Sequence, residues 1–282
     1  MSVRMIQDRL DGYGCRSALD EDQALREITQ EIALAGLGRT DFFRKAALQG
    51  GTCLRIFHGL NRFSEDLDFA LNAPGRSFAL RPYLDVLARE LTAYGYGLEM
   101  NDRSKTDQAV RMAFLKDDSL GHLLQLAYRP ATGPPRKLRV KLEVDTNPPA
   151  GASVETKYLD FPFPSAVCVF DPPSLFAGKL HALLCREYLK GRDWYDFVWY
   201  TARGTPVNYG LLASALTQLG PWRGQRPRVD RDWCREQLRA KIEATDWARA
   251  REDVRRFVKP GEAPSLDVWG REFFLTQCDK LA

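Results

Sequence analysis

Residues 50–69 read G-G-T-C-L-R-I-F-H-G-L-N-R-F-S-E-D-L-D-F, and this stretch decides how the first half of the chain folds. The two glycines follow a short apolar run at 46–48, which predicts a strand ending in a turn, and a short helix is expected over 52–57. A turn over 62–64 leads into Asp66–Leu71, where polar and apolar residues alternate as on a half-buried strand. The stretch therefore predicts strand, glycine turn, helix and strand.

Asp66 and Asp68 carry the most specific chemistry of this stretch. Side chains two residues apart on a strand point to the same face, about 6.5–7 Å apart. Two carboxylates so placed repel each other unless a cation lies between them, and oxygen ligands suit Mg²⁺ or Mn²⁺. Glu143, or failing it Asp145, could add a third acid and permit a two-metal site. A D-x-D motif alone is more often a solvated strand edge.

The neighbouring residues make the metal interpretation more specific. Gly50 and Gly51 lack side chains, so their amides can approach a phosphate closely. Ser64 lies two residues before the first aspartate, where its hydroxyl could donate to a terminal phosphate or simply cap a turn. Arg55 and Arg62 add positive charge nearby. Together these residues predict a site for a metal-bound nucleoside triphosphate.

The rest of the chain suggests an α+β protein with two domains. Helices are expected from Asp20 to a stop at Gly36 and Gly38, and after a cap at Ser77. Strands are expected at 110–115, 123–129 and 138–144, the last two joined by a turn over 130–135 as an antiparallel hairpin. We therefore predict an α+β domain over 1–150, with a small mixed or antiparallel sheet flanked by helices. A loop at 147–153 would lead to an all-α domain over 151–282.

The C-terminal half reads as helical after a strand-like run at 167–170. Its periodic segments are predicted to begin near five residues: Pro172, Asn208, Asp230, Asp246 and Leu266. Basic residues gather at 222–228 and 249–259, where they could contact phosphates or form a solvated helix face.

Composition narrows the class of protein further. The six cysteines and three histidines are scattered without a C-x-x-C pair, which argues against structural zinc. Neither a signal peptide nor an apolar run of membrane-spanning length is seen, so a cytoplasmic protein is expected.

A second block strengthens the interpretation: residues 170–200 read F-D-P-P-S-L-F-A-G-K-L-H-A-L-L-C-R-E-Y-L-K-G-R-D-W-Y-D-F-V-W-Y. The glycine turn, helix and S-x-D-x-D strand resemble the DNA polymerase β-like nucleotidyltransferase superfamily. The string R-F-S-E-D-L-D-F, followed by K-L-x-A-L-x-x-R and R-D-x-x-D, is similar to the AbiEii/AbiGii toxin family, which includes the MenT toxins.

The resemblance implies roles for individual residues. Lys179 would reach the triphosphate, Asp196 would be a catalytic acid, and Asp193 and Arg186 would support the nucleotide site. From the residues alone, Lys179 could equally be an exposed helix lysine and Asp193 a helix N-cap.

The resemblance also implies a function: a toxin of a toxin–antitoxin or abortive-infection system that uses NTP and Mg²⁺. Its acceptor would be the 3′ end of tRNA, and a neighbouring gene would encode its antitoxin, in some systems a kinase that modifies the serine matching Ser64. Two alternatives stay open: an antibiotic-modifying nucleotidyltransferase, which would need an acidic acceptor pocket, and a non-catalytic protein that binds nucleotide or antitoxin.

Overall fold

A computed structural model describes residues 2–97, 99–104, 109–117, 124, 126–128 and 138–282. Its chain divides into two compact units. Unit 1 comprises Met1–His58, Phe63–Pro148 and Thr156–Val169, and unit 2 comprises Gly59–Arg62, Pro149–Glu155 and Phe170–Ala282. Each unit is therefore built from segments that are separate in the sequence.

Unit 1 contains most of a mixed seven-stranded sheet with the order β3-β4-β5-β2-β1-β7-β6. The strands are β1 Ala46–Gln49, β2 Asp66–Leu71, β3 Glu99–Asp102, β4 Val110–Asp117, β5 Leu138–Asp145, β6 Val154–Leu159 and β7 Ser165–Phe170. β2 runs antiparallel to β1 and parallel to β5, and β4 is antiparallel to β5. The central strands of the sheet thus bring together segments far apart in the sequence.

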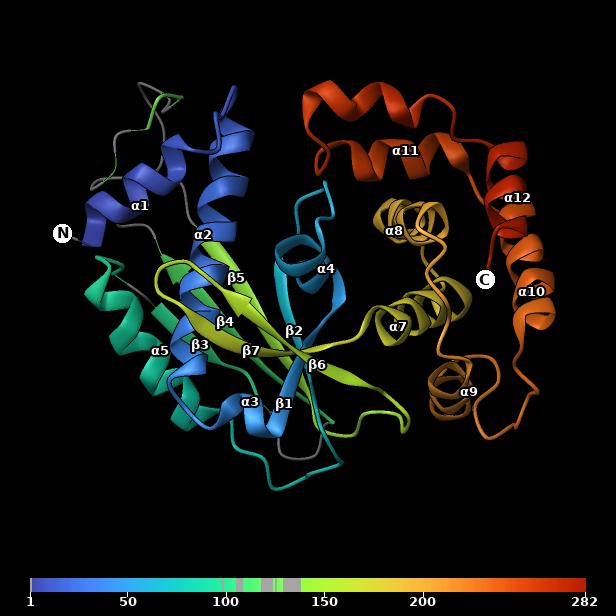
Figure 1. The fold of residues 1–282 in the computed structure, drawn as a ribbon, viewed down its shortest axis with the longest axis horizontal. Coiled ribbons are helices and arrows are strands. Elements are labelled where there is room, and N and C mark those ends of the chain that lie inside the picture. The colour runs from blue at the N-terminus through green and yellow to red at the C-terminus, as the bar shows by residue number, and fades with distance from the viewer. Residues whose placement is uncertain (1, 98, 105–108, 118–123, 125, 129–137) are drawn as a thin grey trace. The chain divides into compact units, whose positions relative to one another are not determined.

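The helices of unit 1 are α1 Ser2–Asp11, α2 Ala18–Gly38, α3 Phe42–Lys45, α4 Gly50–His58 and α5 Arg81–Ala93. α2 packs against α5 and β5, as Figure 1 shows, and α4 packs against β1 and β2. The core side of β2 is held by Leu67 and Phe69, whose side chains are buried, and the ring of Phe69 meets Phe42 edge-on at 4.9 Å.

Several sequence predictions for unit 1 are confirmed and others are wrong. The strand, turn, helix and strand across 46–71 are present. Ser17 caps α2 by accepting from the Asp20 amide, so Asp20 lies in the first turn instead. α5 begins at Arg81 without a side-chain cap from Ser77. The predicted strand at 123–129 and its turn at 130–135 fall largely outside the described residues, and the antiparallel partner of β5 is β4.

The predicted domain plan needs one correction. β6 and β7 lie beyond residue 150 and still join the sheet, so the segment after the Pro/Gly-rich loop is not helical. β6 alternates exposed and half-buried residues, a pattern of a short strand at a sheet edge, and six residues carry too weak a signal to separate it from a loop.

The helices of unit 2 are α7 Pro172–Cys185, α8 Gly191–Ala202, α9 Tyr209–Gln218, α10 Arg231–Glu243, α11 Trp247–Arg255, the 3-10 helix η1 Pro260–Leu266, and α12 Arg271–Asp279. Helices begin near Asn208, Asp230 and Asp246, as the sequence predicts, and each of these residues caps its helix by accepting a backbone N–H. The last helix starts at Arg271, five residues later than predicted, because a proline-containing 3-10 turn intervenes. None of the helices in the described ranges has the length and apolar content needed to cross a membrane.

Candidate active site

The two aspartates of β2 lie beside β5 in a register that brings a third carboxylate to them. Asp66 is opposite Lys141, and Asp68 is opposite Glu143. The residues that alternate with them on both strands are buried in the core, so these four polar side chains share the other face of the sheet. The adjacent strands and shared face that the sequence predicts for three acids are therefore present.

The register separates the two candidates for the third acid. Glu143 is half-buried and pairs with Lys141, the two charged atoms lying 2.7 Å apart. Asp145 is opposite Ala70, two residues beyond Asp68 on β2, and accepts a hydrogen bond from the Asn147 amide at 2.8 Å. Burial raises the pKa of Asp145. Position along the strand therefore favours Glu143 as the acid that acts with Asp68.

Gly50, the first residue of α4, is in close contact with Asp68. A Cβ at this position would lie 2.8 Å from Oδ2 of Asp68, and the φ of +75° is one that side-chain-bearing residues rarely adopt. The next turn is fixed as well, because the Thr52 hydroxyl donates to the Asp66 carbonyl at 2.5 Å. Gly50 and Gly51 therefore begin a helix whose first turn is tied to the strand that carries the aspartates.

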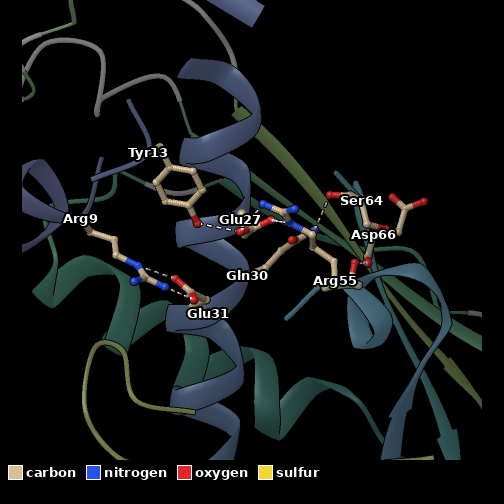
Figure 2. A network of polar contacts seen from close by, with 9 residues as sticks. Arg9, Tyr13, Glu27, Gln30, Glu31, Arg55, Ser64 and Asp66 are labelled. Carbon is tan, nitrogen blue, oxygen red and sulfur yellow. Dashed lines mark hydrogen bonds and ion pairs between the residues drawn. The ribbon is translucent and has the colours of Figure 1, made fainter. Parts of the chain in front are cut away.

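Ser64 is held in place through its backbone. Gln30 of α2 donates from Nε2 to the Ser64 carbonyl at 3.2 Å, as Figure 2 shows. Within the described part of the chain the Ser64 hydroxyl makes no hydrogen bond, so it does not cap a turn there. The half-buried hydroxyl is available for other chemistry two residues before Asp66.

Arg55 uses its charge differently from the phosphate contact that the sequence suggests. Its guanidinium donates to Glu27 of α2 at 2.7 and 3.3 Å and lies 4.5 Å from the centre of the Phe63 ring. Both charged side chains are largely buried, so Glu27 already neutralises the arginine. Arg55 in this structure braces α4 against α2.

The same face of α2 connects to α1 and was not singled out from the sequence. Tyr13 donates to Glu27 at 2.8 Å, and Arg9 pairs with Glu31 at 2.5 Å (Figure 2). Burial raises the pKa of Glu31 to about 7 and outweighs the opposite effect of Arg9. The available signal was a polar stripe in an otherwise apolar helix, Glu27, Gln30 and Glu31, spaced by three and four residues.

The second group of predicted residues forms an ion-pair network inside unit 2. Arg62 donates to both oxygens of Asp196 at 2.6 and 2.5 Å, and Lys179 of α7 lies 2.7 Å from the same carboxylate. Asp196 is fully buried and Arg62 nearly so. Arg62 is therefore committed to a buried ion pair in this structure, and its role in nucleotide binding stays a prediction. Asp196 orients two cations.

Asp193 and Arg186 extend this network toward the surface. Lys179 donates to Asp193 at 2.8 Å, and Arg186 pairs with the other oxygen of the same carboxylate. Burial alone would raise the pKa of Asp193, but the charges of Lys179 and Arg186 outweigh it and lower the pKa. Burial would lower the pKa of Lys179, yet the two aspartates raise it. Lys179 is therefore held protonated, with 13% of its side chain exposed.

A metal would find suitable donor atoms at the β2–β5 face. Asp66, Asp68 and Glu143 offer carboxylate oxygens, which Mg²⁺ and Mn²⁺ prefer. Across the described residues, no three His, Cys, Asp or Glu side chains converge closely enough to form a metal site by themselves. Asp66, Asp68 and Glu143 suit an ion that arrives with its nucleotide, because Mg²⁺ commonly takes part of its coordination from substrate phosphates.

A glycine turn into a helix, followed by a strand with S-x-D-x-D beside a third acid, defines the nucleotidyltransferase class. The model of the family described as "Nucleotidyl transferase AbiEii toxin, Type IV TA system" matches residues 32–272. The chain belongs to this family, which confirms the resemblance seen in the sequence.

Solved structures give a weaker comparison. MenT4, a nucleotidyltransferase toxin from Mycobacterium tuberculosis, is 17% identical over 98% of this chain and 99% of its own, with a TM-score of 0.49. JHP933 from Helicobacter pylori is also 17% identical, over 92% and 94% of the two chains, with a TM-score of 0.49. These scores are too low to establish a shared fold. Comparison with curated protein sequences finds no match.

Proposed function

We propose that the protein is a metal-dependent toxin that transfers a nucleoside monophosphate from an NTP to the 3′ end of tRNA and so blocks translation. The observation that carries the proposal is the register of β2 and β5, with Asp68 opposite Glu143 and Asp66 on the same face. Membership of the AbiEii family supports the reaction class and the existence of a cognate antitoxin.

In the proposed reaction the acceptor hydroxyl oxygen attacks the α-phosphorus of the NTP. A phosphodiester bond forms, the bond to pyrophosphate breaks, and the hydroxyl proton is released. Asp66, Asp68 and Glu143 would hold Mg²⁺ or Mn²⁺, which when bound would offset the triphosphate charge and lower the pKa of the attacking hydroxyl. By holding the metal, the three carboxylates would also orient the phosphates relative to the strand.

We assign the triphosphate to the start of α4 in unit 1. Lys179 of unit 2 is the lysine that the family resemblance implies for the triphosphate. The free amides of Gly50 and Gly51 form a helix N-terminus, which favours anions. Lys179 carries a secure positive charge because Asp193 and Asp196 raise its pKa. In this arrangement Asp196 acts as a positioning residue that holds the ammonium in place, since its own carboxylate is fully buried.

We assign the acceptor to the C-terminal part of the chain, residues 151–282. Arg223, Arg226 and Arg228 are exposed in the first basic stretch, and the Trp222 ring beside them packs edge-on against Trp233 at 5.2 Å. Exposed arginines next to an aromatic ring suit an RNA strand, which offers phosphates and stackable bases.

Ser64 is the proposed control point. Its hydroxyl is free of hydrogen bonds in the described structure, and its carbonyl is anchored by Gln30, so a modification would not disturb the fold locally. A phosphate on Ser64 would carry about −1.5 to −2 charges close to the aspartates and would repel the triphosphate. An antitoxin with kinase activity could switch the enzyme off in this way.

The test is to incubate the protein with total tRNA, Mg²⁺ and each α-labelled NTP in turn. Wild type should label tRNA with one NTP, and chelation by EDTA should stop the reaction. Asp68→Asn and Glu143→Gln should lose activity by orders of magnitude. Asp145→Asn is the matched control on the same strand and should stay active. An active Asp68→Asn, or tRNA that no NTP labels, would contradict the proposal.

A further inference from the structure

A cavity in unit 2 is not used by the chemistry proposed above. It has a volume of about 380 Å³, within the range of small-ligand pockets, and it lies among the C-terminal end of α7, the start of α8, the end of α10 and the start of α11. Arg186 and Asp193, which end the Lys179 network, form one of its walls. The remaining charged residues on its walls are Glu187, Lys190, Lys241, Asp246 and Arg249.

Three of the cations at this cavity form no direct ion pair with any described residue. Within the described part of the chain, the side chains of Lys190, Lys241 and Arg249 make no ion pair or hydrogen bond, although Glu187 and Asp246 also line the cavity. Lys190 is half-buried, and its burial, followed by the charge of Arg192, lowers its pKa. The Asp193 carboxylate acts on the Lys190 pKa in the opposite direction, but it already pairs with Lys179 and Arg186. An anionic ligand can therefore recover part of the free energy that burying the ammonium costs.

Backbone packing holds the cations around the cavity. Gly191 follows Lys190 directly, and a Cβ on it would lie 2.0 Å from the carbonyl oxygen of Ala250, the residue after Arg249. The Gly191 amide also donates to Asp253 of α11 at 2.8 Å. The starts of α8 and α11 are therefore fixed against each other, and each brings a cation to the cavity.

We propose that this cavity binds a backbone phosphate of the acceptor RNA, a proposal that rests on the proposed function. The cations come from three separate segments, the residue before α8, α10 and α11, which suits a phosphodiester strand better than a single small anion. Tyr188 at the same cavity is 67% exposed, and the Arg186 guanidinium lies 5.1 Å from its ring centre. An exposed ring at a cavity that is also lined by Lys190, Lys241 and Arg249 offers a stacking surface for a neighbouring base.

The experiment measures binding without turnover. Fluorescence anisotropy of 5′-labelled total tRNA is recorded between 50 and 200 mM salt for wild type, Lys190→Ala, Lys241→Ala and the control Lys280→Ala. Lys280 is an exposed lysine of unit 2 outside the cavity. Each cavity variant should weaken tRNA binding about 3- to 10-fold. The slope of the logarithm of the binding constant against the logarithm of the salt concentration should become shallower by about 0.7–0.9, the amount for one lost phosphate contact. The affinity for a non-hydrolysable NTP should not change.

Two results would overturn the assignment. If the cavity variants weaken NTP binding and leave tRNA binding intact, the cavity serves the triphosphate. If they behave like Lys280→Ala, or if wild type does not bind tRNA, the cavity is not an RNA site. Because no transfer is required, a wild-type protein that binds tRNA through this cavity but labels nothing would sink the proposed reaction and leave this site standing.

Discussion

Gly50→Ala tests whether the glycine turn positions the candidate metal site. The added Cβ would lie 2.8 Å from Oδ2 of Asp68, whereas ordinary contact begins at 3.4 Å, so the carboxylate must move by about 0.6 Å. The φ of +75° adds strain of about 1–2 kcal/mol for a residue with a side chain. Misplacing a reacting group by about 1 Å costs up to about 100-fold in rate, so we expect a loss of about 10- to 100-fold.

Gly59→Ala is the matched control at the other end of α4. Its φ of +73° gives the same backbone strain, but a Cβ there has no atom within 4 Å. Thermal unfolding should show similar losses for both variants, each about 1–2 kcal/mol. Only Gly50→Ala should lose transfer of label from α-labelled NTP and weaken Mg²⁺-dependent NTP binding measured by calorimetry. Equal transfer rates for the two variants would refute the positioning role of Gly50.

Three further predictions concern the helices. Lys179→Ala should weaken binding of a non-hydrolysable NTP in calorimetry, and Lys179→Arg should restore little of it, because a wide guanidinium replaces a compact ammonium; unchanged affinity would remove this lysine from the site. Asp196→Ala should lower the free energy of unfolding by about 3–5 kcal/mol in chemical denaturation, because it leaves the buried Arg62 guanidinium without this partner. An unaltered denaturation midpoint would argue against a stabilising role for the Arg62–Asp196 pair. Burial raises the pKa of the Glu31 carboxyl in the folded state to about 7. Between about pH 4.5 and 7 the native state therefore binds more protons than the unfolded state. The free energy of unfolding falls as pH rises through that window. In urea unfolding, the free energy of unfolding of wild type should fall by on the order of 3 kcal/mol more than that of Glu31→Gln between pH 5 and pH 8. Parallel pH profiles of the two proteins would contradict this.

Local pattern was sufficient for the elements and for the faces they present. Alternation in Asp66–Leu71 placed both aspartates on one face, and polar residues before apolar runs marked three helix N-termini in unit 2. These features depend on neighbours within a few residues, which a sequence displays directly. The family resemblance came from the same short stretches, and the match over residues 32–272 confirms it.

Long-range pairing decided what those elements do. The sequence offered two acids on β5. Only the register with β2 showed that Glu143 lies opposite Asp68 and that Asp145 lies two residues further along, opposite Ala70. Arg55 and Arg62 look alike in the sequence as cations beside the site, yet Glu27 and Asp196 neutralise them. A partner 28 or 134 residues distant leaves no mark on local periodicity, so a charge becomes a brace or a ligand only through the packing around it.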